Sequence, residues 1–400
     1  MIHLGDITKI NGGTAPVVDA VIGGSPCQDL SIAGKRAGLS GERSGLYMEQ
    51  IRVTREMREH DRANGRSGEF IRPRFMVWEN VPGAFSSNHG KDFAAVLEEA
   101  VRIVEPEAPP VPVPKKGWAT SGCLMGDGWS VAWRVLDAKF WGVPQTRRRI
   151  VLVADFGGQS APEILFVRKG VPGDSEPGSE ARKGLAGGTE SGTSYAVRIR
   201  GGCDGGGKGA LVQEEKSGTL GCNNDQIVFC NSTSAGFSAS MGAKAWNLVC
   251  AVDCRNGTEN PETNGTLQAK STGGQSLNLN NVVREAMTVR RLTPLECERL
   301  QGFPDGWTGI GGWVDSKGKT RKTTDSARYK ALGNSIALPP WKWVLKRICA
   351  QYERDATMAS LFDGIGGFPL IWEQLNGKGS CLWASEIEEF PMAVTRKHFG

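Results

Sequence analysis

Short apolar runs that end in polar or glycine-containing turns constrain this chain more than any other feature of its sequence. Residues 17–24 have the composition of a buried strand that ends in a glycine turn, and residues 74–80 and 149–154 have similar apolar runs. Helical periodicity lies between them, for example at residues 93–101. This alternation predicts an α/β fold with a parallel sheet covered by helices on both faces.

Composition narrows the class of protein. The 400 residues allow two or three domains, and 39% hydrophobic with 23% charged residues is ordinary for a globular protein. No run of 18 apolar residues and no secretion leader occurs, so we expect no membrane span and a cytoplasmic location. We expect the ten cysteines to be reduced. The net charge of +5 is compatible with a nucleic-acid partner without requiring one.

The composition changes near residue 157, where Gly, Ser, Thr and Asn become frequent. Strand-like runs at 194–200 and 226–229 favour a small β-rich domain, with low-complexity disorder as the alternative for parts of 157–190. Helical pattern returns after Thr293, which predicts a helix with a capping box closed by Glu296. The expected divisions are 1–156 (first α/β part), 157–287 (β-rich insert), 288–349 (return segment), 350–357 (joint) and 358–400 (second α/β part).

A glycine-rich loop follows the apolar run at 359–362. Gly364 and Gly366 lie where a strand should give way to a helix, and a tight structural turn is the alternative to a ligand loop. The third glycine of the dinucleotide fingerprint is replaced by Pro369, which argues against a pyrophosphate cradle. Glu386 ends the next apolar run, where an acid would hold ribose hydroxyls. Together these residues predict a nucleoside cofactor such as S-adenosylmethionine.

A cysteine directly after a predicted strand is a candidate nucleophile. Cys27 lies between Pro26 and Gln28, just after the run at 17–24. A single cysteine is more often a buried structural residue. However, Glu79 ends another predicted strand, and a thiolate and a carboxyl at neighbouring strand ends can act as a nucleophile–acid pair.

Taken together, these motifs resemble the signature blocks of the DNA (cytosine-5) methyltransferases. The resemblance spans nearly the whole chain apart from 157–287 and implies a Rossmann-like S-adenosylmethionine-dependent methyltransferase sheet with a smaller β-rich target-recognition domain. The resembling blocks are Gly24–Gln28, Glu79–Val81, Gln145–Arg149, Arg291–Cys297, Gln301–Pro304 and Gly333–Ser335, and Phe362–Gly367 is similar to the family's cofactor loop.

The resemblance also implies roles for single residues. Cys27 would attack carbon 6 of a flipped cytosine while Glu79 contacts ring nitrogen 3 and the amino group, and Arg147 and Arg149 would hold the base carbonyl and favour the thiolate. The implied cofactor-binding residues are Asp6, Ile7, Pro26, Leu46, Asn334, Ser335, Phe362, Gly364, Gly366, Glu386 and Ile387. The implied DNA-binding residues are Gln28, Ser31, Lys35, Arg36 and Arg291.

The resulting expectation is a monomeric methyltransferase of a bacterial or phage modification system that acts on double-stranded DNA. A cognate restriction endonuclease would act separately, and the sequence gives no base code for the target. An RNA cytosine-5 methyltransferase and a catalytically idle DNA-binding relative remain open. No metal is expected, because Cys222, Cys230, Cys250 and Cys254 lack the close spacing of ordinary zinc ligands.

The order of the motifs differs from the usual order in that family. Members usually begin with the cofactor loop, whereas here that loop comes last and Gly5-Asp6-Ile7 comes first. We therefore expect a circularly permuted chain in which the loop and Cys27 meet across one sheet. The alternative is a coding sequence linearised at an arbitrary point of a circular genome, with Met358 as an ordinary start.

Overall fold

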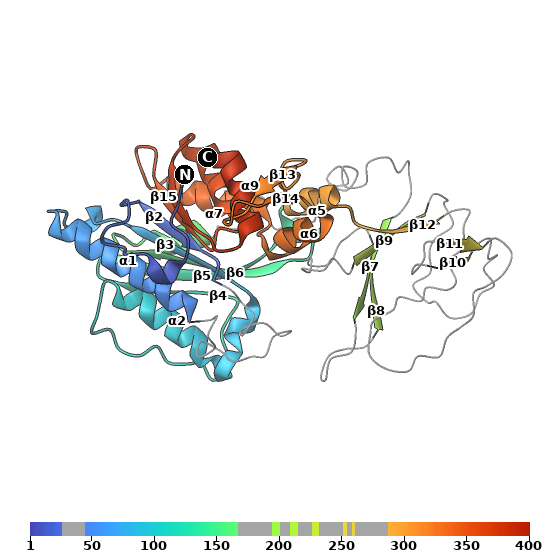
Figure 1. Ribbon diagram of the computed structural model, residues 1–400. Coiled ribbons are helices and arrows are strands. Elements are labelled where there is room, and N and C mark those ends of the chain that lie inside the picture. The colour runs from blue at the N-terminus through green and yellow to red at the C-terminus, as the bar shows by residue number, and fades with distance from the viewer. Residues whose placement is uncertain are drawn as a thin grey trace.

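An eight-stranded mixed sheet forms the centre of the molecule (Figure 1). The computed structural model describes residues 1–25, 45–166 and 292–400, together with the backbone of strands within 194–291. The strand order is β1-β16-β15-β2-β3-β6-β5-β4. The bounds are Ile2–His3 (β1), Ala20–Gly23 (β2), Phe75–Asn80 (β3), Ser121–Gly126 (β4), Trp129–Asp137 (β5), Arg148–Asp155 (β6), Met358–Leu361 (β15) and Cys381–Ser385 (β16).

The predicted strands at 17–24, 74–80 and 149–154 are confirmed as β2, β3 and β6, but the expectation of a parallel sheet is only half right. The four pairings from β1 to β3 are parallel. The three pairings from β3 through β6 and β5 to β4 are antiparallel. β6 could not be told from a parallel strand by composition, because strands buried on both faces are continuously apolar in either direction.

The β4–β5 hairpin is part of the sheet that sequence reasoning missed. Gly126 faces Trp129 across a two-residue turn made of Asp127 and Gly128. Gly128 has a φ of +72°, which suits this kind of turn. The Asp-Gly pair between two strand-like runs is a recognised hairpin signal and could have revealed the hairpin.

Helices cover both faces of the sheet, as predicted (Figure 1). Neighbouring strand residues alternate between the faces: Ile22 and Val77 pack with α7 and α8, whereas Met76 packs with α1 and α2. Thr293 closes the predicted capping box with Glu296 at the start of α5. The bounds are Leu46–Ala63 (α1), Lys91–Arg102 (α2), Ala161–Leu165 (α3), Pro294–Gln301 (α5), Asp325–Asn334 (α6), Leu338–Cys349 (α7), Gly367–Asn376 (α8) and Glu389–Phe399 (α9).

The last part of the chain supplies the middle of the sheet. β15 lies between β16 and β2, and Met358 faces Ala20 in register. The joint before β15 is held by the buried Asp19, whose carboxylate accepts hydrogen bonds from Arg354 and from Thr357, 335 and 338 positions away in the sequence. The Met1 amino group donates to the Phe399 carbonyl at 3.0 Å, so the two ends of the chain are neighbours.

Smaller sheets complete the described structure. A four-stranded sheet has the order β12-β9-β7-β8, and Figure 1 draws it beside the main body. It confirms the predicted strands at 194–200 and 226–229, and β12 joins it from the predicted return segment, while the domain divisions themselves stay a prediction. The bounds are Ser194–Arg200 (β7), Gly209–Glu214 (β8), Gln226–Asn231 (β9), Ala251–Asp253 (β10), Thr258–Asn260 (β11), Met287–Arg291 (β12), Gly312–Val314 (β13) and Thr320–Lys322 (β14).

Candidate active site

One edge of the sheet gathers most of the predicted site residues. Because β1, β16, β15, β2 and β3 are parallel neighbours, their carboxyl ends open on the same edge. Asp6 follows β1, Glu386 follows β16, the glycine loop follows β15, and Glu79 lies at the end of β3. This edge is where open α/β sheets bind their ligands.

Glu79 and Arg149 form a close ion pair at this edge. Arg149 lies near the start of β6, which runs antiparallel to β3 and so begins where β3 ends. Its Nε atom is 2.7 Å from a carboxylate oxygen of Glu79, and the two side chains are 17% and 12% exposed. The pair is therefore fixed, largely shielded from solvent, and still reachable from the edge of the sheet.

The backbone that leads toward the predicted nucleophile passes beside this pair. A Cβ atom on Gly24 would lie 2.9 Å from Glu79 Oε2, so a glycine is what allows the close approach. The next residue, Ser25, is buried and accepts a hydrogen bond from the Trp78 indole at 2.9 Å. The Asn80 amide also donates to Ser25, at 3.4 Å. Strand β3 thus holds the chain up to Ser25 through two buried side chains.

Arg147 occupies a different place from Arg149. It is buried, and its Nη2 atom donates to the carbonyls of Ser335 and Gly333, the latter at 3.3 Å. Ile336 follows directly, and a Cβ atom on Gly367 would come within 2.9 Å of it. Arg147 therefore ties the start of β6 to the segment that packs on the glycine loop, whereas Arg149 faces the Glu79 carboxylate.

The glycine loop has the backbone geometry of a ligand cradle. Phe362, Gly364 and Gly366 have φ values of +54°, +57° and +78°. The Gly364 amide donates to Glu386 Oε2 at 2.8 Å, while the amides of Ile387 and Glu388 donate to Oε1. A Cβ atom on Gly364 would meet nothing within 4 Å, so the loop faces open space there.

Apolar side chains from three segments meet beside this loop. Ile7, Leu46 and Phe362 belong to or pack against one hydrophobic cluster with residues of β2, β15 and β16. Ile387, which directly follows Glu386, is 69% exposed. Asp6 caps the short helix at Ile7–Lys9 by accepting from the Thr8 amide, so its carboxylate is engaged locally. At the end of α6, Asn334 is exposed and Ser335 is buried.

Sequence reasoning missed two residues that shape the loop. The pKa of Asp363 is raised to about 8, chiefly by burial and also by the nearby Glu386, while a hydrogen bond from Ser360 acts in the opposite direction. The Trp307 indole donates to the Ile365 carbonyl at 2.8 Å and fixes the other side of the loop. Asp363 could have been found from the sequence, because it lies inside the glycine loop Phe362–Gly367. The Trp307 contact could not, because it joins residues 58 positions apart.

Several predicted residues lie outside the described residues, including the nucleophile. They are Pro26, Cys27, Gln28, Ser31, Lys35 and Arg36, and of Arg291 only the backbone is described. The side chains of the four cysteines that were considered as zinc ligands, Cys222, Cys230, Cys250 and Cys254, also lie outside the described part of the chain. Within 1–25, 45–166 and 292–400, no group of metal-ligating side chains suits a metal ion. Nor does any helix there have the length and apolarity to cross a bilayer.

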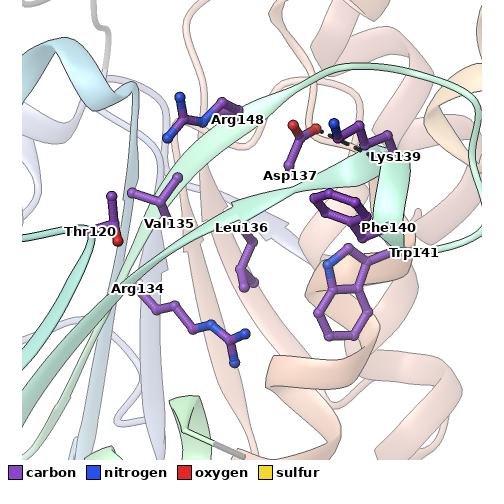
Figure 2. A pocket seen from close by; sticks show the side chains of 9 residues that line it. All are labelled: Thr120, Arg134, Val135, Leu136, Asp137, Lys139, Phe140, Trp141 and Arg148. Carbon is purple, nitrogen blue, oxygen red and sulfur yellow. Dashed lines mark hydrogen bonds between the residues drawn. The ribbon is translucent and has the colours of Figure 1, made fainter. Parts of the chain in front are cut away.

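Figure 2 shows a hollow of about 390 Å³ on the antiparallel side of the sheet. It lies along β5 and the start of β6 and is lined by Thr120, Arg134, Val135, Leu136, Asp137, Lys139, Phe140, Trp141 and Arg148. One lining residue is connected to the candidate site: the Asp137 carboxylate accepts a hydrogen bond from the Arg147 amide at 3.0 Å. Neither Glu79 nor the glycine loop lines it, so the candidate site described above lies outside this hollow.

The family model for C-5 cytosine-specific DNA methylases matches residues 1–102 and 208–350. A protein described as DNA N-6-adenine-methyltransferase, from Escherichia phage P1, is 29% identical over 440 residues, which cover 89% of this chain and 56% of that protein. Type II methyltransferase M2.BsuMI of Bacillus subtilis is 25% identical over 345 residues, or 85% of this chain and 61% of the relative. The chain thus spans little more than half the length of these curated relatives.

Solved structures of methyltransferases align with most of the chain, but with low TM-scores. Entamoeba histolytica methyltransferase EhMeth has 12% identity and a TM-score of 0.40, and covers 83% of this chain and 77% of its own. S. pombe Dnmt2 methyltransferase has 13% identity and a TM-score of 0.38, with 86% and 83% covered. The α/β assignment therefore depends on the sheet order and the helical layers described above.

Proposed function

Because the chain belongs to the C-5 cytosine-specific DNA methylase family, we propose that it transfers a methyl group from S-adenosylmethionine to carbon 5 of cytosine in double-stranded DNA. One observation carries the proposal: the Glu79–Arg149 pair and the Gly364–Glu386 loop open on the same edge of one mixed sheet, where its parallel strands end. A carboxylate for a base and a cradle for a nucleoside thus share one edge, with only β2 between the strands that carry Glu79 and the glycine loop.

The loop fits S-adenosylmethionine by its chemistry. Gly364 faces open space with a positive φ, so a ligand can approach its backbone closely. Glu386 is oriented by three backbone amides, and its remaining lone pairs can accept ribose hydroxyls. The exposed Ile387 offers an apolar surface for an adenine ring. When bound there, S-adenosylmethionine supplies an electrophilic methyl group.

The base chemistry needs a nucleophile, because carbon 6 of cytosine is a poor electrophile. We assign this role to Cys27: its thiolate adds to carbon 6, and the electron pair moves toward carbon 5 as the Glu79 carboxyl group gives a proton to ring nitrogen 3 and accepts a hydrogen bond from the amino group. Carbon 5 would then take the methyl group, with S-adenosylhomocysteine as the leaving group. A base would remove the proton from carbon 5, and the thiolate would leave as the bond between carbons 5 and 6 becomes double again. The cytosine must first be flipped out of the duplex to reach this edge.

Arg149 and Arg147 would have different roles in this reaction. Arg149 contacts the Glu79 carboxylate and fixes its orientation toward the base. Arg147 holds the carbonyls of Gly333 and Ser335, and so acts as a positioning residue for the wall between base and cofactor. Both guanidinium charges favour a thiolate nearby, which is the second role expected for them.

The motif order supports a permuted connection of the family's sheet. The family match ends at residue 350, before the loop and Glu386, as expected where these elements are displaced from the family's usual order. The neighbouring ends, Met1 and Phe399, would be joined in an unpermuted chain. We further propose that the four-stranded sheet recognises the target sequence, and that the enzyme acts as a monomer in a bacterial or phage-infected cytoplasm, with any cognate endonuclease acting separately.

The test is transfer of tritium from labelled S-adenosylmethionine to duplex DNA, followed by nucleoside analysis. We expect 5-methylcytosine from the unaltered protein and none from Cys27→Ser. Glu79→Gln keeps the shape of the side chain but removes its charge and acid–base function, and should lower kcat by about 10²–10⁴. Methylated tRNA without methylated DNA would show that the RNA alternative is right. DNA binding without transfer would identify an idle relative.

A second candidate, methylation of adenine N6, is favoured by one observation. The phage P1 relative carries that description and matches 89% of this chain. The match leaves 44% of that protein uncovered, so the named activity can reside in the unmatched part. An exocyclic amine needs no covalent thiol adduct, and therefore N6-methyladenine formed equally by Cys27→Ser would identify this activity.

A further inference from the structure

A small basic hairpin stands apart from the site described above. β13 and β14 pair antiparallel, with Gly312 opposite Lys322 and Val314 opposite Thr320. Lys317 and Lys319 lie in the turn between them, and all three lysines are exposed. Figure 1 shows the hairpin at the margin of the main body, near α5 and α6.

The hairpin is held rigidly at its turn. The Asp315 carboxylate accepts hydrogen bonds from the amides of Lys317 and Lys319, at 3.0 and 2.8 Å, and from Arg321 Nε at 2.8 Å. An isolated two-stranded hairpin is only marginally stable in water. These bonds fix the turn from which the exposed Lys317 and Lys319 project.

The hairpin is also anchored to α9, the helix that follows Glu386. The Trp313 ring packs on the Phe390 ring, with centroids 5.9 Å apart. The Ser316 hydroxyl and amide both donate to the Glu389 carboxylate. The base of the hairpin is therefore fastened to the element that forms one side of the proposed cofactor site.

The positive charge of the hairpin exceeds the negative charge beside it, because Lys317, Lys319, Arg321 and Lys322 are opposed by Asp315 and by the Glu389 carboxylate that Ser316 contacts. Asp315 pairs with Arg321, and on the neighbouring α9 Glu388 pairs with Lys330. Within the part of the chain that the structure describes, Lys317, Lys319 and Lys322 form no ion pair. A fixed row of exposed cations concentrates positive potential and suits a polyanion better than a neutral partner.

We propose that the β13–β14 hairpin binds backbone phosphates of the DNA outside the target base, through Lys317, Lys319 and Lys322. The inference rests on the proposed function, which supplies duplex DNA as the polyanion. Phosphate contacts of this kind position a protein on DNA without reading its sequence. The contribution should therefore be the same on duplexes of different sequence.

The test compares full-length Lys317→Ala/Lys319→Ala/Lys322→Ala protein with the unaltered chain. Binding of fluorescent duplexes is measured by anisotropy across a series of salt concentrations. Three lost phosphate contacts should reduce the slope of log K against log salt by roughly 2–3. KM for DNA should rise, while kcat at saturating DNA stays unchanged because the hairpin contacts neither Glu79 nor the glycine loop.

Two variants serve as controls. Lys115→Ala/Lys116→Ala/Lys378→Ala removes three exposed lysines from other surface loops and should leave the slope unchanged. Replacing the three hairpin lysines with arginine keeps the charges and should also keep the slope. Thermal unfolding of each variant shows whether the fold is intact, and an equal slope change in the control triple would contradict a role specific to the hairpin.

The outcomes separate this inference from the proposed function. If the unaltered protein binds no duplex DNA even at low salt, both are wrong. If it binds and methylates DNA with a slope that the hairpin lysines do not affect, only the hairpin proposal is wrong. Polyglutamate serves as a second probe: binding that depends on the three lysines, with an unchanged DNA slope, would instead indicate an acidic protein partner.

Discussion

The carboxyl group of Asp363 lies buried under the glycine loop, and burial raises its pKa to about 8. The folded protein therefore keeps a proton that the unfolded chain releases above its ordinary pKa of 3.8. By linkage, the free energy of unfolding should decrease as the pH rises from about 4 to 8, by at most about 1.4 kcal/mol per pH unit.

Asp363→Asn should abolish this pH dependence, because an amide has no proton to lose and can still accept the hydrogen bond from Ser360. Urea unfolding at several pH values between 5 and 8 measures the slope. Asp355→Asn, at an exposed position of the joint, is the matched control. Equal slopes for Asp363→Asn and the unaltered protein would show that Asp363 ionises normally.

The two loop glycines should respond differently to alanine. Gly366→Ala places a Cβ atom 2.6 Å from the Phe399 ring at a φ of +78°, so it should destabilise the protein by about 2 kcal/mol or more. Gly364→Ala meets open space, and should cost only about 1–2 kcal/mol of backbone strain while weakening S-adenosylmethionine binding. Urea unfolding and calorimetric titration with S-adenosylmethionine distinguish the two effects. Normal cofactor affinity in Gly364→Ala would argue against the cradle.

At the scale of elements, the joint before β15 depends on one buried carboxylate. Burial acts to raise the pKa of Asp19, but hydrogen bonds from Arg354 and Thr357 outweigh it and lower that pKa. Asp19 therefore contributes stability above its unfolded pKa, and this stability is lost as the pH falls through the lower folded value. The joint should be sensitive to acid rather than to alkali.

Arg354→Ala should lower the free energy of unfolding by about 1–2 kcal/mol at pH 7, because Asp19 keeps its bonds from Thr357 but loses the guanidinium. The partial exposure of Arg354 keeps the cost modest. Stability curves at pH 7 and pH 4 measure the change, with Glu353→Ala as an exposed control. A variant that is as stable as the control at both values would show that the joint is held by other contacts.

Elements with local signals were predictable from the sequence, and elements fixed by distant contacts were not. The capping box at Thr293 is confirmed because it depends on residues three positions apart. Glu386 was expected at the end of its strand, where the structure places it. The direction of β6, by contrast, depends on its pairing with β3, and the Arg147–Ser335 contact joins residues 188 positions apart. No local pattern encodes either.

At the scale of the whole molecule, the connection between the ends is a testable property of the fold. A chain rearranged to run from Met358 to Gly400, through a short glycine linker to Met1, and on to Thr357 should form the same sheet, because Met1 and Phe399 are hydrogen-bonded neighbours. Its cooperative unfolding and S-adenosylmethionine affinity should match those of the unaltered chain. A second rearrangement that starts at Val77, inside β3, should not fold. If the first rearranged chain also fails to fold, a loop cannot replace the present break between Gly400 and Met1.

The position of β15 has a consequence for biosynthesis. The ribosome makes the strand between β16 and β2 only after about nine-tenths of these 400 residues have been joined. Until then β2 presents an open edge, β1 has no neighbour in its sheet, and the first 350 residues have no way to close around a nucleotide. Unpaired edges of this kind attract chaperones and other nascent chains. In this order of synthesis, the strands that carry the glycine loop and Glu386 can join β2 only after the segments before them have been made.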